Sequence, residues 1–213
     1  MRTVLLMNPN SNPDTTTIMC ETAGAVLGYP PIGWTAPSGP SIITTPEALA
    51  HAASLVEAVE PGPEISAVIV AAFGDPGARG LQDRLSCPVI GIGAASARAA
   101  STGGSRFAVA TTTPDLKPPI DALMKAEGLA GSYLGCFLTE GDPLTLMEDA
   151  RALDRALLAA VSRAEAAGAE HVIIGGGPLG AAAERLRSCT NVPLFNPVIC
   201  AAREVAALWK CGS

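Results

Sequence analysis

Several features that mark other protein classes are missing from this chain of 213 residues. No apolar run approaches the ~18 residues of a membrane-spanning helix, so we expect no membrane segment. No basic run is present and the formal net charge is −6, which disfavours nucleic acids and anionic membrane surfaces as partners. The expected partner is therefore a small molecule.

The cysteine and histidine spacings of a metal site are also missing. The six cysteines, at positions 20, 87, 136, 189, 200 and 211, form no C-x-x-C pair, and there are only two histidines, His51 and His171. This pattern predicts neither a structural zinc site nor a disulfide framework, and it is typical of a reducing compartment. The N-terminal apolar stretch runs into Asn8 without the features of a signal peptide. We therefore expect a cytoplasmic protein without metal.

The most informative feature that is present is an internal repeat. The segment VIVAAFGDPG at 68–77 returns as VIIGGGPLG at 172–180, so that Ala72 falls on Gly176, 104 residues further along. This offset is about half of the chain. A duplicated strand-loop-helix unit predicts two similar domains that face each other across a shared cleft.

Apolar strand-like runs alternate with longer alanine-rich stretches of helical period, which is the pattern of parallel βα units. We predict strands near 2–7, 33–36, 66–72, 88–92, 106–110, 132–137, 171–175 and 192–195, and helices near 13–26, 45–59, 77–85, 94–101, 115–126, 147–167, 179–188 and 198–209. Eight units fit a closed barrel or two four-stranded halves. For the second architecture the halves are residues 1–100 and 101–213, and the final helix is free to pack back on the first half.

In either architecture ligands bind beyond the C-terminal ends of the strands. The loops after the first, third, fifth and seventh strands are polar or glycine-rich, and each opens a helix. Their amide, hydroxyl and backbone donors would converge on a carboxylate or an enolate-like oxygen, although turn and cap preferences explain any single loop as well. The candidate binding residues are Asn8, Asn10, Ser11, Phe73, Gly74, Thr111, Thr112, Thr113, Gly175, Gly176, Gly177 and Pro178.

Five sequence words in this order carry a family resemblance. They are NPNS at 8–11, FGDPG at 73–77, PVIGI at 88–92, FAVATT at 107–112 and IIG at 173–175. Together they resemble the aspartate/glutamate/hydantoin racemase superfamily, most closely its hydantoin and allantoin racemase branch. The resemblance implies two pseudo-symmetric parallel-sheet α/β domains with the site in the cleft between them. It also implies no cofactor, a small carboxylate or cyclic ureide as ligand, and assembly into homo-oligomers.

The chain departs from the family at the positions that carry the chemistry. Racemases of this family use two cysteines on opposite faces of the substrate carbon, one to remove the α-proton and one to return a proton. Ala72 and Gly176 stand at these positions, and neither side chain can carry a proton. Asp75 is the carboxylate beside them and the candidate base, but a cap of the following helix is the simpler role for it. We expect the remaining cysteines and both histidines to be packing residues.

Three functions remain open on this basis. The first is an isomerase-like enzyme of the racemase superfamily that acts on a small carboxylate or a cyclic ureide or amide through an anion-stabilising cleft. The second is a lyase, by decarboxylation or elimination, or a hydrolase on the same scaffold. The third is a non-catalytic small-molecule binding protein. An ordinary racemase with engineered substitutions fits less well, because the residues after Gly176 differ from the family too.

Overall fold

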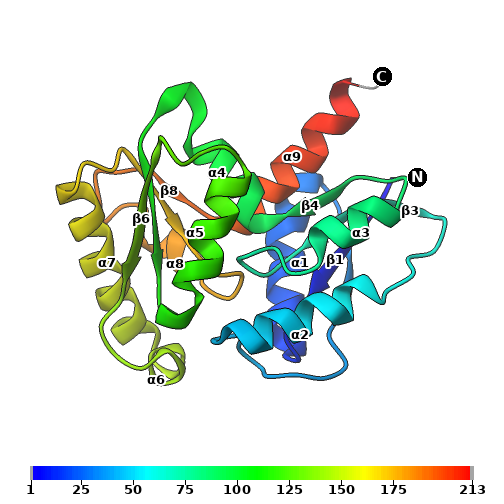
Figure 1. Cartoon of the computed structure of the whole chain (residues 1–213), viewed down its shortest axis with the longest axis horizontal. Coiled ribbons are helices and arrows are strands. Elements are labelled where there is room, and N and C mark those ends of the chain that lie inside the picture. Colours follow the sequence, from blue (N-terminus) through cyan, green and yellow to red (C-terminus); the bar gives the residue numbers. More distant parts are fainter. Residues whose placement is uncertain (1, 212–213) are drawn as a thin grey trace.

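The computed structural model describes residues 2–211 and contains two four-stranded parallel sheets (Figure 1). The first sheet has the order β2-β1-β3-β4 and consists of β1 (Thr3–Asn8), β2 (Ile32–Thr35), β3 (Ile65–Val70) and β4 (Val89–Gly91). The second repeats this arrangement as β6-β5-β7-β8, with β5 (Phe107–Thr111), β6 (Tyr133–Leu138), β7 (His171–Ile174) and β8 (Leu194–Phe195). The eight units therefore form two halves and not a closed barrel.

Helices follow the strands in both halves. They are α1 (Pro13–Leu27), α2 (Pro46–Glu57), α3 (Ala78–Arg84), α4 (Ile92–Ala100), α5 (Lys117–Ala126), α6 (Pro143–Glu148), α7 (Ala150–Ala166), α8 (Gly180–Leu186) and α9 (Pro197–Cys211), with short 3-10 turns at Thr102–Gly104 and Pro114–Leu116. No helix within the described range is long and apolar enough to cross a bilayer. Most predicted elements agree with these bounds to within two residues.

The helix predicted at 147–167 is confirmed as α7, but its start is wrong: α7 begins at Ala150, and the short helix α6 precedes it and ends at Glu148. The Asp142 side chain accepts a hydrogen bond from the backbone N–H of Thr145 at 2.8 Å and caps α6. Asp149 accepts from the N–H of Arg151 and Ala152 and caps α7. Asp149 therefore stands at the C-terminus of α6 and at the N-terminus of α7. The alanine-rich period across residues 147–167 hides this break.

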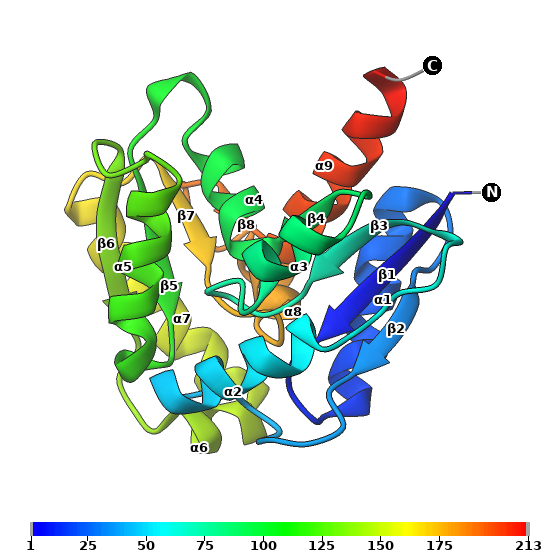
Figure 2. The ribbon, with the colours of Figure 1, turned by 45° about the vertical axis from the view of Figure 1, so that its right-hand side comes forward.

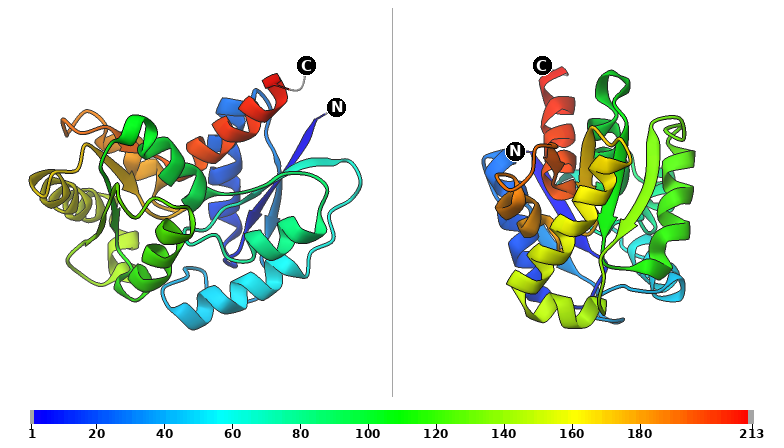
Figure 3. Two further views of the ribbon diagram at one scale, coloured as in Figure 1. Left: turned by 45° about the horizontal axis from the view of Figure 1, so that its top comes forward. Right: turned by 90° about the vertical axis from the view of Figure 1, so that its left-hand side faces the viewer.

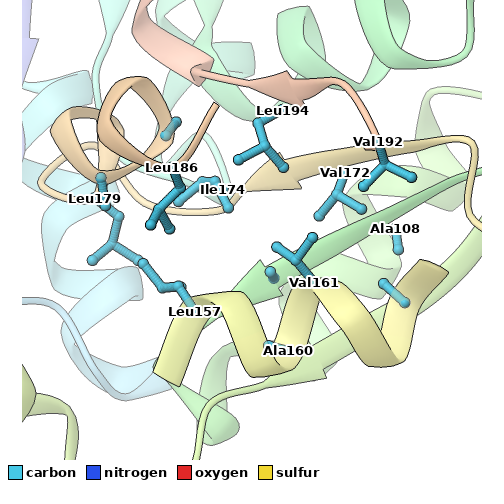
Figure 4. Close-up of a cluster of buried hydrophobic side chains, with 14 of the residues drawn as sticks. Ala108, Leu157, Ala160, Val161, Val172, Ile174, Leu179, Leu186, Val192 and Leu194 are labelled. Carbon is cyan, nitrogen blue, oxygen red and sulfur yellow. The ribbon is translucent and has the colours of Figure 1, made fainter. Parts of the chain in front are cut away.

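The central strands of both sheets are buried on both faces, as parallel sheets require. All five residues of β5 are buried. Figure 4 shows one core cluster, which contains Leu157 and Val161 of α7 together with Val172 and Leu194 of the second sheet. Burial of these aliphatic side chains is the main stabilising contribution of this half.

The last helix of each half crosses to the other half. Helix α9 follows the second sheet in sequence but packs on α1, β3 and β4 of the first half. Helices α9 and α1 lie side by side in Figures 1 and 3. In return α4 follows the first sheet but contacts α5, β7 and β8. Ala97 and Ala100 of α4 share a core cluster with Phe107 and Ile173 of the second half. The two halves are therefore held together by reciprocal helix packing.

Candidate functional site

A cavity lies between the halves at the C-terminal ends of the strands. The arrowheads of β1 and β7 point toward the same edge of the molecule, where α2 and α6 lie (Figure 2). The volume of the cavity, counted as the space that the centre of a water molecule can occupy, is about 60 Å³. One bound water needs ~10–15 Å³ by the same measure. The lining residues are Asn10, Ile42, Ile43, Ala71, Ala72, Phe73, Thr111, Thr112, Thr113, Leu116, Ile120, Met147, Gly175, Gly176, Gly177, Pro178 and Leu179.

The loop after β1 contributes one hydrogen-bond donor to this cavity through Asn10. The Asn10 Oδ1 accepts from the backbone N–H of Asn12 at 3.0 Å and from Asn8 Nδ2 at 2.8 Å. Because a backbone N–H can only donate, this contact fixes the amide orientation and leaves Asn10 Nδ2 as a donor. No described residue accepts a hydrogen bond from Nδ2, and Asn10 lines the cavity. A ligand oxygen can therefore take this donor.

Two other candidates in this loop hold the loop together and do not line the cavity. Asn8 is fully buried, and its Nδ2 donates to Asn10 Oδ1, to the Asn12 carbonyl and to Thr16 Oγ1. The Ser11 hydroxyl donates to the carbonyl of Gly39 at 2.9 Å and so ties this loop to the segment before α2. Both residues act on a ligand only through the shape of the loop.

The threonine loop after β5 presents hydroxyl groups from the second half. The Thr111 Oγ1 donates to the carbonyl of Gly175 at 2.8 Å and lies 3.3 Å from Thr113 Oγ1. The proton of Thr111 is thus committed, and its oxygen accepts from Thr113. Thr112 is 4% exposed, and its hydroxyl makes no hydrogen bond to the described part of the protein. The Thr112 hydroxyl is the group of this loop that is available to a ligand.

The loop after β7 is a turn of three glycines that faces the first half. Gly176 has φ +153°, a backbone conformation that side chains rarely adopt, and a Cβ there would lie 3.1 Å from Leu179 Cδ1. A Cβ on Gly177 would lie 2.6 Å from the carbonyl oxygen of Ala71. Over residues 2–211, no acceptor takes the backbone N–H of Gly176 or Gly177. Both residues line the cavity, so their N–H groups are further candidate donors for an oxyanion.

The cavity wall carries no ionisable side chain among the residues described. Ala72 and Gly176, where the resemblance implies cysteines, both line the cavity. The rest of the wall is apolar or carries only amide and hydroxyl groups. This arrangement can bind a carbonyl or carboxylate oxygen, but its side chains cannot transfer a proton at neutral pH.

Asp75 lies outside the cavity lining. Its Oδ1 accepts from the N–H of Gly93 and its Oδ2 from the N–H of Ala94, both at 2.7 Å. Burial raises the pKa of Asp75 to about 7, against the two backbone hydrogen bonds, which lower it. The expected cap of the next helix is wrong: α3 begins at Ala78, its N-cap residue Gly77 makes no side-chain cap, and Asp75 caps α4 instead. We assign Asp75 no part in proton transfer.

Neither histidine lies on the cavity wall, and nor does the thiol of Cys20, Cys87, Cys136, Cys189 or Cys200. The side chain of Cys211 lies outside the described part of the chain. Burial raises the pKa of Cys136 to about 11, and its Sγ lies 3.1 Å from the Tyr133 hydroxyl. Cys200 is buried, and desolvation likewise raises its pKa to about 11. His171 Nδ1 contacts the carbonyl of Ala100 at 2.6 Å. No group of three or more potential metal ligands exists among the described residues.

Several apolar residues of the wall were not found from the sequence. Ile42 and Ile43 come from the segment before α2, Met147 from α6, and Leu116 and Ile120 from the start of the α5 region. Ile43 is 9% exposed although it lies outside any helix or strand. The available signal was a pair of isoleucines in an otherwise polar connection, which is unusual for a surface loop.

Comparisons with known proteins identify the family and agree with the fold. The family model described as Asp/Glu/Hydantoin racemase matches residues 4–205. A hydantoin racemase of Paenarthrobacter aurescens is 27% identical over 216 residues, which cover 98% of this chain and 92% of the relative. One from Rhizobium meliloti is 32% identical over 149 residues, which cover 70% of this chain but only 62% of the relative. The solved allantoin racemase from Pseudomonas fluorescens has a TM-score of 0.88 at 29% identity, over 100% of this chain and 92% of that chain.

Proposed function

The chain belongs to the Asp/Glu/hydantoin racemase family, and from this premise we propose that it is a cofactor-independent isomerase of a small cyclic ureide. The observation that carries the proposal is the set of unpaired donors in an apolar cavity without ionisable groups. These donors are Asn10 Nδ2, the Thr112 hydroxyl and the backbone N–H groups of Gly176 and Gly177. They are placed to stabilise an oxygen that gains negative charge.

The chemistry follows from what the cavity supplies and what it lacks. Removal of the proton from the α-carbon of a ureide moves the electron pair onto the neighbouring carbonyl oxygen, which gives an enolate. Fixed donors in a cavity of low polarity stabilise that oxygen more than water does. Since no side chain of the wall can accept the proton, water or hydroxide accepts it. A proton returned from solvent to the opposite face of the carbon completes the inversion.

The apolar wall favours a ligand with an apolar substituent. Ile42, Ile43 and Met147 line the cavity, and the hydrogen-bonding groups of the wall belong to the loops after the strands. A ureido substituent held against these side chains would lose its hydrogen bonds to water without replacement, which costs roughly 1–3 kcal/mol per group. We therefore propose a ring such as a hydantoin with an aliphatic substituent, in preference to allantoin.

Hydrogen exchange at the substrate carbon tests this proposal. Enantiopure 5-isobutylhydantoin is incubated with the protein in deuterium oxide, and both deuterium uptake and loss of optical rotation are followed. We expect Thr112→Ala to slow exchange at least tenfold, because one oxyanion donor contributes about 10²–10³ in kcat in other enzymes. Thr112→Ser keeps the hydroxyl and should keep the rate, and Thr17→Ala on the exposed face of α1 is the matched control. Equal rates for Thr112→Ala and the wild type would refute the role of the cavity.

A non-catalytic binding protein is the second candidate, and the absence of an ionisable side chain in the described cavity wall favours it. Thermal stabilisation by the same hydantoin without any exchange would select this function. A lyase is distinguished by turnover of phenylmalonate, since loss of carbon dioxide produces an enolate without removal of a proton by the protein. Both assays use the same protein preparation.

A further inference from the structure

We propose that Asp75 is a positioning residue. Its carboxylate joins the loop after β3, residues 71–77, to the start of helix α4 by two hydrogen bonds, which we call the clasp, and thereby sets the place of Ala72 and Phe73 in the cavity. This proposal rests on the proposed function in one respect only, the choice of a hydantoin as the ligand whose affinity is measured. The clasp itself is a property of the protein alone and can be tested without any substrate.

The backbone at Asp75 is held in an unusual conformation. Asp75 has φ +51° and is the one non-glycine residue with positive φ in the described chain. Its N–H donates to the carbonyl of Ala72 at 3.1 Å, and its carbonyl accepts from Ala78 at 3.2 Å. Aspartate visits this region more readily than most residues, but the conformation still needs support from its surroundings. The side chain supplies that support.

The carboxylate spans two segments that are far apart in sequence. It binds Gly93 and Ala94, eighteen and nineteen residues further along, with one oxygen on each N–H. The start of α4 is shaped to receive it: a Cβ on Gly91 would lie 2.1 Å from Asp75 Cγ, and one on Gly93 would lie 3.0 Å from Asp75 Oδ1. Gly91, the N-cap of α4, offers no side chain of its own. The helix therefore depends on Asp75 for its cap.

Helix α4 is anchored in the second half, so the clasp reaches across the molecule. Ala97 and Ala100 pack with Phe107 and Ile173, and the carbonyl of Ala100 contacts His171 Nδ1. On the other side of the clasp, Phe73 approaches the glycine turn, where a Cβ on Gly175 would lie 3.5 Å from Phe73 Cε1. The loop that carries Ala72 and Phe73 is thus fixed relative to the second half through Asp75.

Amide hydrogen exchange and ligand affinity together test this role. In Asp75→Asn one of the two acceptors becomes an N–H donor, so exchange at Gly93 and Ala94 should rise at least tenfold. If the loop depends on the clasp, exchange at Ala78 should rise as well, and the dissociation constant for 5-isobutylhydantoin should increase at least fivefold. Asp83→Asn, on the exposed face of α3, is the matched carboxylate control.

A second variant and a stability control separate positioning from a general loss of stability. Gly91→Ala displaces the carboxylate without changing its charge and should reproduce the pattern of Asp75→Asn. Leu157→Ala weakens the core of the second half away from Ala78 and should leave exchange at Ala78 unchanged. An effect of Asp75→Asn that is confined to Gly93 and Ala94 would overturn the proposal, since a cap alone explains it. If no hydantoin binds the wild type, the proposed function fails, and exchange at Ala78 still decides the clasp.

Discussion

The glycine turn after β7 makes its closest approach to the first half at Gly177, and we expect Gly177→Ala to destabilise the protein. A Cβ at this position would lie 2.6 Å from the carbonyl oxygen of Ala71 and 2.7 Å from Met19 Sδ. Ordinary contact begins at 3.4 Å, so the oxygen would have to move by 0.8 Å. The Ala71 oxygen belongs to the backbone, and the N–H of the same residue is bonded to Met7 at 2.8 Å. It has no rotamer by which to avoid the methyl group.

The magnitude follows from the cost of overpacking. An added methyl group in a packed site costs roughly 1–3 kcal/mol. For a protein of this size 1 kcal/mol corresponds to about 2–4 °C in Tm, so we expect a decrease of about 2–12 °C by calorimetry. Because the contact joins the two halves at the cavity wall, the affinity for a hydantoin should fall too.

Gly131→Ala is the control for this substitution. A Cβ on Gly131 would meet no atom within 4 Å, and this glycine has no positive φ. We expect its free energy of unfolding to stay within ~0.5 kcal/mol of the wild type, as for most surface substitutions. If Gly177→Ala is equally neutral, the close contact between the halves does not exist in solution, and the described shape of the cavity is wrong.

Three further predictions concern backbone strain, core packing and pH. Gly176→Ala should lower the free energy of unfolding by about 1–3 kcal/mol, because of the φ of +153° and the contact of the new Cβ with Leu179. The loss should exceed that of Gly104→Ala, where φ is also positive but a Cβ would meet no atom within 4 Å. Equal losses would assign the whole effect to φ. Leu157→Ala removes a fully buried side chain and should cost about 2–5 kcal/mol, measured by urea unfolding; a loss below ~1 kcal/mol would contradict the described core. For Asp75, burial raises the folded pKa from 3.8 to about 7, against the backbone hydrogen bonds from Ala94 and Gly93 and with smaller effects of Glu127 and Arg98, so the folded state holds this proton more tightly than the unfolded chain. The contribution of this proton to stability should be complete below pH 3.8 and be lost as pH rises to about 7, at up to ~1.4 kcal/mol per pH unit. Urea unfolding at several pH values should therefore give different slopes of unfolding free energy against pH for the wild type and Asp75→Asn. Identical slopes would contradict the raised pKa.

The sequence predicts the sheets well because their signal is local. Each central strand is a short run of apolar residues bounded by turn residues, and the repeat around Ala72 and Gly176 indicates two halves. The positions of the strands and their parallel βα connections follow from these patterns, whereas the order of the strands within each sheet is known only from the structure. The apolar side chains of each strand thus predict that the strand is buried.

The contacts that shape the cavity were harder to predict because they are not local. Asp75 lies three residues before the first residue of α3, and the usual preference of aspartate for the N-cap points to that helix. Its positive φ turns the side chain toward Gly93 instead, eighteen residues away. Similarly, the place of Ile42 and Met147 in one wall depends on how the two halves pack. The glycines at 91 and 93 are the sequence signal for the first contact, since a helix start without side chains can admit a cap from elsewhere.

The two positions at which the family resemblance implies cysteines are not equivalent in this protein. Ala72 has a Cβ at the cavity wall and no positive φ, so a larger side chain there changes only the space in the cavity. Gly176 has a φ that side chains rarely adopt, and a Cβ would press on Leu179. The backbone of the second position is thus built for glycine, and its N–H is left as a donor. The backbone N–H at this position does not depend on the side chain, so under the proposed function glycine removes a proton carrier from this face but keeps a donor for an enolate oxygen.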